Sequence, residues 1–325
     1  MKKIFVTLVL LAAALIAAMS YYAYQPLSLP TVPFEFDLTP GASLKSAALE
    51  LQQAKVLDDQ WTFVLLARAL GKSLQIKAGN YELRQAVTPI QLLQIITKGE
   101  FSRRKISIIE GWTFRQFRNA LDANKYLLHD SIGLSDREIL QRIGASEPQA
   151  EGLFFPDTYH YVAGNSDLSI LKIAYSTMQR RLQEAWVVRD DGLPLQTPYQ
   201  ALILASIVEK ETGTAEDRSM IAGVFINRLR KNMLLQTDPT VIYGIGDSFD
   251  GNLRKRDLLE DTPYNTYTRR GLTPTPIALP GMAVLRATLH PAKTDALYFV
   301  GRGDGRSQFS SNLSAHNRAV RRYQQ

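Results

Sequence analysis

The chain has 325 residues, of which 45% are hydrophobic and 21% are charged, a globular composition that excludes wholesale disorder. Its 38 Lys and Arg residues exceed its 31 Asp and Glu residues, and the net charge of +7 favours an anionic partner such as a membrane surface, an acidic glycan or nucleic acid. The lack of cysteine excludes disulfide scaffolds, thiolate zinc sites and Cys nucleophiles, and the four histidines show no metal-ligand spacing, so we expect no metal site.

The first 24 residues predict a membrane anchor. Lys2 and Lys3 precede an apolar run, and no further charged residue occurs before Glu35. The uncharged stretch 4–24 is long enough to cross a bilayer, and the lysines before it predict that residues 1–3 stay in the cytoplasm. A cleaved signal peptide is the alternative, because Ala18-Met19-Ser20 has the spacing that signal peptidase accepts. If residues 4–24 are a membrane anchor, the rest of the chain lies outside the cytoplasm, and nucleic acid is excluded as its partner.

Residues 25–35 contain three prolines and predict an extended linker. After the linker, the order Gly-x-Ser/Thr-apolar-basic marks helix starts at Gly41 and again at Gly111, with Ser43 and Thr113 as N-caps. Thr88-Pro89 predicts another helix start between them, and residues 105–109 alternate as a short strand.

The helix start at Gly41 resembles the opening of LysM-type peptidoglycan-binding modules. The resemblance implies a small LysM-like β-α-α-β domain over residues 36–105. A capped helix without any role in ligand binding is the alternative.

A dense apolar and aromatic cluster occupies residues 151–159. We interpret it as core or as the wall of a cleft. A platform on which sugars stack is the alternative.

A long apolar helix is predicted from Thr197, the N-cap, to a stop at Gly213, with Pro198 at its first position and Gln200 completing a capping box. The run 201–208 is almost wholly apolar, so the helix must be buried.

Two glutamates near the end of this helix point in different directions. At 100° per residue, Glu211 falls on the apolar side with Leu204 and Ile207, and Glu209 is turned about 200° away. Burial and the negative end of the helix dipole both predict a raised pKa for Glu211, as a general acid requires. The alternative is that both glutamates form surface ion pairs with Lys210 or Arg218.

The next helix is predicted from Thr214, with Asp217 in its first turn. Residues 234–244 and 262–267 then mix polar groups into β-prone or aromatic runs that suit a carbohydrate, although turns and packing explain each run separately. Residues 301–306 predict a hairpin loop rather than a phosphate-binding loop, because no helix start follows them.

Several longer strings then occur in a fixed order, namely 204–212, 224–229, 235–244, Tyr264-Asn265-Thr266-Tyr267, His290-Pro291-Ala292 and Tyr298-Phe299-Val300. Together they resemble the YceG-like family of endolytic murein transglycosylases. The resemblance implies an α+β fold with a single N-terminal transmembrane helix, the LysM-like domain, and an α+β catalytic domain over 106–325. It also implies a bacterial inner-membrane protein with a periplasmic catalytic domain.

The activity implied by the resemblance is that of a lyase. It cleaves the β-1,4 bond between N-acetylmuramic acid (MurNAc) and N-acetylglucosamine (GlcNAc) within peptidoglycan strands and leaves 1,6-anhydro-MurNAc ends, using one carboxyl group and no cofactor. The family's catalytic glutamate falls on Glu211, the residue that side-chain geometry also favours. Termination of nascent strands, and partners among peptidoglycan polymerases or division and elongation proteins, are family-level expectations.

We further predict that polar and aromatic residues after the helix line the sugar cleft, with Asp238 positioning the substrate. For two of them, Asn312 and His316, capping and packing of the last helix is an equal alternative. The predicted lining residues are Gln236, Thr237, Asp238, Tyr264, Asn265, Tyr267, Asn312 and His316. The alternative for the whole protein is a non-catalytic peptidoglycan-binding scaffold of a cell-wall synthesis complex.

Overall fold

The computed structural model describes residues 2–211 and 214–324. The chain forms two compact units, one of residues 1–104 with 160–165 and one of residues 105–159 with 166–325. Gly213, the expected helix stop, lies outside the described residues.

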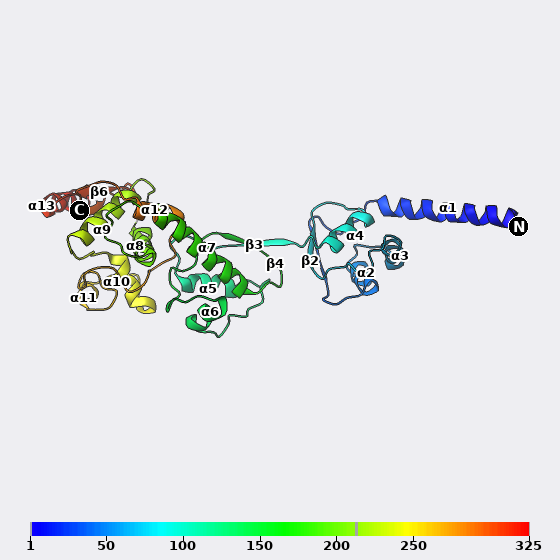
Figure 1. Ribbon diagram of the computed structural model, residues 1–325, viewed down its shortest axis with the longest axis horizontal. Helices are drawn as coiled ribbons and strands as arrows, with labels where there is room; N and C mark the ends of the chain where they lie inside the picture. The colour runs from blue at the N-terminus through cyan, green and yellow to red at the C-terminus, as the bar shows by residue number, and fades with distance from the viewer. Residues whose placement is uncertain (1, 212–213, 325) are drawn as a thin grey trace. The chain divides into compact units, whose positions relative to one another are not determined.

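The first unit begins with helix α1 (Lys2–Tyr24), which Figure 1 shows in blue. It is long and apolar enough to cross a membrane, with a mean hydropathy of 2.4 over its most apolar window. Its side chains from Lys2 to Ala18 are all exposed, as expected of a surface that meets lipid rather than protein. The helix is therefore compatible with the predicted membrane span.

A β-α-α-β arrangement follows α1. Strands β1 (Phe34–Leu38) and β2 (Gly79–Leu83) pair antiparallel from Phe34 opposite Leu83 to Leu38 opposite Gly79. Helices α2 (Leu44–Gln53) and α3 (Gln60–Ala69) lie between them in sequence, and α4 (Pro89–Lys98) follows. Tyr81 is fully buried in the core of this unit and stacks on Phe36 at 5.3 Å between ring centroids.

The predicted helix starts of this unit are confirmed. Ser43 accepts a hydrogen bond from the Ser46 amide at the start of α2, and Thr88 caps α4 in a reciprocal capping box with Gln91. Leu27, inside the expected linker, is buried in the core and its amide donates to the Val87 carbonyl at 2.8 Å. Part of the proline-containing stretch is therefore packed against the unit.

Strands β3 (Arg103–Ser107) and β4 (Thr158–Val162) form a two-stranded sheet, and the division between the units falls within both strands. β3 begins two residues before the predicted strand at 105–109.

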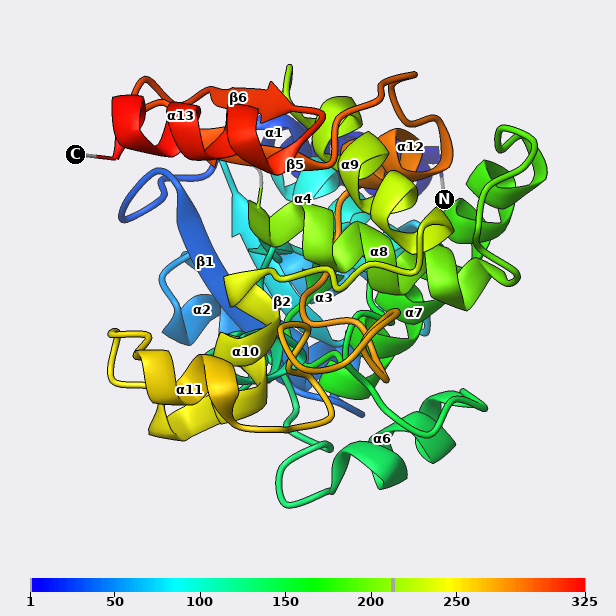
Figure 2. The same ribbon diagram turned by 90° about the vertical axis from the view of Figure 1, so that its left-hand side faces the viewer.

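The second unit is mostly helical and ends in a hairpin and a helix. Figure 2 shows the last helix, in red, beside the hairpin. Its elements are α5 (Phe114–Asp122), α6 (Asp136–Ile143), α7 (Asp167–Val187), α8 (Pro198–Glu211), α9 (Arg218–Arg230), α10 (Asp238–Ile245), the 3-10 turn η1 (Gly246–Ser248), α11 (Lys255–Leu259), α12 (Met282–Leu289), β5 (Tyr298–Gly301), β6 (Ser307–Ser310) and α13 (Leu313–Tyr323).

Helix α8 forms the centre of the second unit and contacts α7, α9, α10 and α12. Every residue from Ala201 to Val208 is buried, as the apolar run predicts. Thr197 accepts a hydrogen bond from the Gln200 amide, which confirms the N-cap. In a reciprocal capping box the Gln200 side chain would accept from the Thr197 amide. It accepts instead from the amide of the preceding residue, Gln196, at 2.7 Å.

Two local predictions are wrong. The next helix begins at Arg218 rather than Thr214, and the Asp217 carboxylate accepts from the distant Ser307 amide at 2.6 Å instead of capping the helix with its side chain. The β-prone run at 234–244 contains helix α10, because Pro239 favours the first turn of a helix, where it lacks a donor that would be unpaired anyway. The hairpin around 301–306 is confirmed by β5 and β6.

The cluster at 151–159 belongs to the core. Phe154 is fully buried and stacks on Phe114 at 4.7 Å, so the sugar-stacking alternative is wrong for this ring. Gly152 has a φ of +79°, and a Cβ there would clash with the side chain of Pro276. The turn therefore requires glycine for both its backbone conformation and its close packing.

Candidate active site

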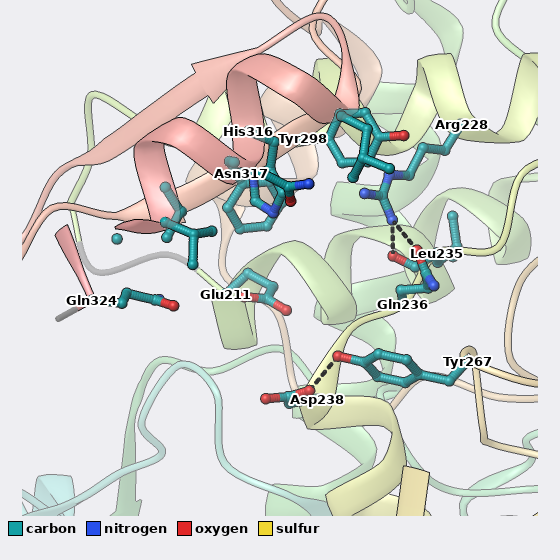
Figure 3. Close-up of a pocket in the computed structure, with 15 residues that line it drawn as sticks. Glu211, Arg228, Leu235, Gln236, Asp238, Tyr267, Tyr298, His316, Asn317 and Gln324 are labelled. Atoms are coloured by element: carbon teal, nitrogen blue, oxygen red, sulfur yellow. Dashed lines mark hydrogen bonds between the residues drawn. The ribbon is translucent and has the colours of Figure 1, made fainter. Parts of the chain in front are cut away.

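Glu211 lies at the last described position of α8 and lines a cavity of about 520 Å³ in the second unit. Figure 3 shows its carboxyl group between the α13 side of the cavity and the residues that precede α10. Arg228 of α9 and Tyr298 of β5 form further walls. The cavity is therefore built from elements that are far apart in sequence.

The Thr237 hydroxyl donates a short hydrogen bond to Glu211 Oε1. Burial raises the pKa of Glu211, the nearby Asp238 carboxylate raises it further, and the Thr237 bond and Arg228 oppose the rise. The direction agrees with the prediction from sequence, and burial is its largest cause. Among the described residues no partner is found for Oε2, so this oxygen is available to a ligand.

Thr237 is also the N-cap residue of α10, yet its side chain caps no amide of that helix. Its own amide donates to Thr266 Oγ1 at 3.1 Å, and its carbonyl accepts from Thr240 Oγ1 at 2.7 Å. The residue is only 2% exposed. Its hydroxyl is thus fixed toward Glu211 by buried hydrogen bonds.

Glu209 points away from this cavity, as its helical position predicts. Its Oε2 accepts a hydrogen bond of 2.9 Å from the Gly281 amide, at the N-terminus of α12. Burial also raises the pKa of Glu209, and the bond from Gly281 opposes that rise. Within the described residues neither Glu209 nor Glu211 forms an ion pair with Lys210 or Arg218, so the surface ion-pair alternative is wrong.

Arg228 is a buried cation that sequence reasoning missed. It is 7% exposed, and its guanidinium donates to the backbone carbonyls of Leu297 at 2.6 Å and Leu235 at 2.8 Å. It also donates to Gln236 Oε1 at 3.4 Å (Figure 3). Burial lowers its pKa, and nearby Tyr298, Tyr267 and Glu211 oppose the change. The Asn-Arg pair directly after the apolar run at 220–226 was the available signal.

Gln236 and Asp238, two of the residues predicted to line a sugar cleft, both line this cavity. Gln236 has a φ of +50°, a left-handed conformation that is uncommon outside glycine, and its amide donates to the Thr266 carbonyl at 3.1 Å. Asp238 accepts a hydrogen bond of 2.5 Å from the Tyr267 hydroxyl (Figure 3). Tyr267 therefore lines the cavity and orients the carboxylate at the start of α10.

The opposite wall comes from α13 and β5. His316 stacks on Tyr298, with 5.1 Å between ring centroids and 24° between planes, and both residues line the cavity beside Asn317. Asn312 does not line it. Its Oδ1 accepts from the Ala315 amide at 2.9 Å, so the capping alternative holds for this residue.

Two predicted residues lie elsewhere. Asn265 is fully buried and its Nδ2 donates to three backbone carbonyls, the nearest being Glu260 at 2.6 Å, so its amide stabilises a loop. Tyr264 lines a different cavity, where its ring meets that of Tyr243. The sequence 264–267 mixes polar and aromatic residues, and this pattern does not show that Tyr267 lines the catalytic cavity while Tyr264 and Asn265 do not.

A family model described as the YceG-like family matches residues 36–322 of the chain. The chain belongs to the YceG-like family. The match spans both compact units and every residue of the cavity described above except Gln324.

Known relatives agree with this assignment. A Bacillus subtilis protein named endolytic murein transglycosylase is 32% identical to this YceG-like chain over 305 residues, covering 88% of the chain and 84% of the relative. A Streptococcus pneumoniae protein of the same name is 26% identical over 360 residues, covering 98% of the chain and 65% of the relative. The crystal structure of a YceG-like protein from Listeria monocytogenes is 28% identical with a TM-score of 0.55, covering 88% of the chain and 98% of that structure. The α+β fold is thus shared with a solved structure.

One group of possible metal ligands lies outside the cavity of this YceG-like chain. Ligand atoms of Asp122, His129 and Asp167 lie within 4.8 Å of one another. The Asp167 carboxylate is buried and accepts hydrogen bonds from Ser131 Oγ at 2.6 Å and from the Leu168 amide at 2.7 Å. These bonds give it a structural role at the start of α7.

Proposed function

We propose that this YceG-like chain is a peptidoglycan lytic transglycosylase, a lyase that cleaves the MurNAc-β-1,4-GlcNAc bond within glycan strands. The observation that carries the proposal is the Glu211 carboxyl group, which has a raised pKa, one oxygen bonded to Thr237 and the other available in a cavity. The names of the Bacillus subtilis and Streptococcus pneumoniae relatives support the same activity.

In the proposed reaction Glu211 first acts as a general acid. Its proton passes to the glycosidic oxygen as the bond to the anomeric carbon breaks. The resulting carboxylate then accepts the proton of the MurNAc C6 hydroxyl, whose oxygen attacks the anomeric carbon and closes the 1,6-anhydro ring. Atoms balance without water, and one carboxyl group serves both steps.

The cavity holds a second carboxylate, that of Asp238. A glycosidase needs a second carboxylate that is free to act as a nucleophile or to activate water. In the proposed lyase Asp238 has neither role, and its Oδ1 accepts the 2.5 Å hydrogen bond from Tyr267. We assign Asp238 to positioning the substrate, together with Gln236, Tyr267 and His316 along the walls.

We propose the following organisation for the rest of the chain. Residues 1–3 are cytoplasmic, 4–24 span the bacterial inner membrane once and 25–35 link the span to a LysM-like domain over 36–105. The catalytic domain, 106–325, is periplasmic. The β-α-α-β order of the first unit supports the LysM-like assignment, and exposed α1 supports the anchor. Cleavage near the membrane would terminate nascent strands made by peptidoglycan polymerases of the division or elongation machinery.

Product analysis tests the activity. The full chain in detergent is incubated with purified sacculi, and the new glycan ends are identified by mass spectrometry. A lyase yields 1,6-anhydro-MurNAc ends, one water lighter than the reducing ends of a hydrolase. Reducing ends would contradict the lyase assignment.

The Glu211→Gln variant is the matched control, because it keeps the shape of the side chain and removes its titratable proton. We expect product formation to fall at least about a thousandfold. A non-catalytic scaffold predicts no products from either protein, and retained activity in Glu211→Gln would refute the role of Glu211.

A further inference from the structure

A second cavity, of about 760 Å³, lies within the same compact unit. The first turn of α5, the loop at 149–151, the C-terminal half of α10 and Phe249 form its walls, and Tyr264 closes one side. The catalytic proposal uses none of these residues. The cavity is larger than the one that holds Glu211.

One wall of this second cavity is aromatic and rigid. The rings of Tyr243 and Tyr264 meet edge to face at 5.0 Å, and the Tyr264 hydroxyl is hydrogen-bonded to Thr275 Oγ1 at 2.9 Å. Gly244 allows this contact, since a Cβ there would lie 3.1 Å from the Tyr264 Cβ. Both rings remain partly exposed, so they offer a preformed surface to a ligand.

The charged groups of the cavity are already compensated. Arg115 pairs closely with Asp247, and Arg118 pairs with Asp136 at 2.9 Å. The remaining carboxyl group, Glu151, is 8% exposed and accepts from the Phe114 amide at 3.0 Å and the Tyr243 hydroxyl at 3.2 Å. Burial raises the pKa of Glu151 to about 7, so much of it is neutral at neutral pH. Such a site suits the hydroxyl and acetamido groups of a saccharide.

Helix α10 links the two cavities. Its first residue, Asp238, lines the catalytic cavity, and Ile242 and Tyr243 line the second one. Tyr243 lies five positions after Asp238, which corresponds to about 7.5 Å along the axis. The two cavities are therefore lined by residues from the two halves of one short helix.

We propose that the second cavity is a distal glycan-binding site, which holds the saccharide segment beyond the one bound at Glu211. The proposal rests on the proposed function, because an enzyme that cuts within a strand has sugar units on both sides of the cleaved bond. Aromatic rings contact the sugar faces, and Gln149 and Thr113 supply hydrogen bonds to hydroxyl and acetamido groups. The cavity would make binding depend on strand length.

Binding measurements in the inactive Glu211→Gln background test this site separately from catalysis. The full chain in detergent is titrated with peptide-free glycan strands, prepared by amidase digestion of peptidoglycan and sorted into a single disaccharide and longer strands. Phe249→Ala removes one aromatic wall, and we expect about tenfold weaker binding of the longer strands. Affinity for the disaccharide should change less than about twofold.

Two further variants complete the design. Gln149→Trp fills the cavity from an exposed loop position and should reproduce the loss on longer strands even if Phe249→Ala folds poorly. Leu259→Ala, at an exposed residue of α11 outside both cavities, is the matched control and should bind both ligands as the parent does. Unchanged affinity for longer strands in Gln149→Trp, or an equal loss for both ligands, would overturn the distal site. Neither result would alter the product analysis that tests Glu211.

Discussion

Glu209 and Glu211 lie two residues apart on one helix and have opposite roles in the structure. Glu211 lies in a cavity with one oxygen held by a side-chain hydroxyl, whereas Glu209 is bonded to the backbone amide of Gly281. Burial raises the pKa of both groups. A raised pKa alone therefore does not identify a catalytic carboxyl group. What distinguishes Glu211 is that it lines the cavity, which Glu209 does not.

The comparison also shows how the end of α8 is fixed. Glu209 joins it to the start of α12, and the Lys210 ammonium donates to the Gly111 carbonyl at 3.3 Å. The Gly111 amide in turn donates to the Leu279 carbonyl at 2.9 Å. These contacts hold the turn that carries Glu211, so we assign Glu209 a positioning role.

Removal of the Glu209 carboxylate should have a larger effect on activity than the other changes considered below. Glu209→Ala leaves the Gly281 amide without its acceptor, which costs about 1 to 3 kcal/mol of stability, and frees the turn before Glu211. A displacement of the catalytic carboxyl group by about 1 Å can lower the rate a hundredfold. We therefore expect kcat to fall about a hundredfold with little change in KM. Steady-state kinetics and thermal unfolding measure both effects.

Glu209→Gln is the matched control, since its amide oxygen can still accept from Gly281. It should retain activity within about threefold of the wild type. Equal loss in the Ala and Gln variants would show that Glu209 acts through its proton, which would contradict the contrast with Glu211.

A smaller effect is expected when the Thr237 bond is removed. Thr237→Val keeps the side-chain volume and deletes the donor to Glu211, so we expect about a tenfold loss of kcat from a less well oriented acid.

The wild-type rate should fall as pH rises through the raised pKa of Glu211, because the general acid loses its proton. Since the Thr237 bond lowers that pKa, the alkaline limb of Thr237→Val should lie at higher pH than in the wild type. An unmoved limb in the pH-rate profile would contradict this assignment.

The smallest effect concerns stability. Glu211 has a higher pKa folded than its value of about 4.3 in the unfolded chain, so the folded state binds its proton more tightly. The contribution of Glu211 to the free energy of unfolding is fully present below the pKa of the unfolded state and is lost as pH rises through the pKa of the folded state. Each tenfold difference in proton affinity between the two states is worth about 1.4 kcal/mol. Glu211→Gln should therefore be more stable than the wild type at alkaline pH, as thermal unfolding across pH would measure. Wild-type stability that rose over the same range relative to Glu211→Gln would contradict the direction of the pKa change.

Local sequence rules predicted the parts of the fold that depend on neighbouring residues. The caps at Ser43, Thr88 and Thr113 are confirmed because each side chain bonds an amide three residues away. The side of α8 that carries Glu211 was predictable for a similar reason, since 3.6-residue periodicity sets the direction of a side chain.

The rest of the site depends on contacts between distant segments. Arg228 is held by the carbonyl of Leu297, 69 residues away, and no local pattern encodes that contact. The β-prone Val241, Ile242 and Tyr243 hid the start signal at Pro239, so α10 was missed. Without α10 there was no basis for assigning Tyr264 and Tyr267 to different cavities.

The hydrogen bond from the Thr237 hydroxyl to Glu211 affects the local stability of the first turn of α10. A threonine at an N-cap ordinarily satisfies an amide of its own helix, worth about 1 kcal/mol, but here the hydroxyl is committed to Glu211. The first turn of α10 is thus locally frustrated, because its best local arrangement conflicts with the arrangement that serves the cavity. Amides in that turn should therefore exchange with solvent earlier than those of buried α8.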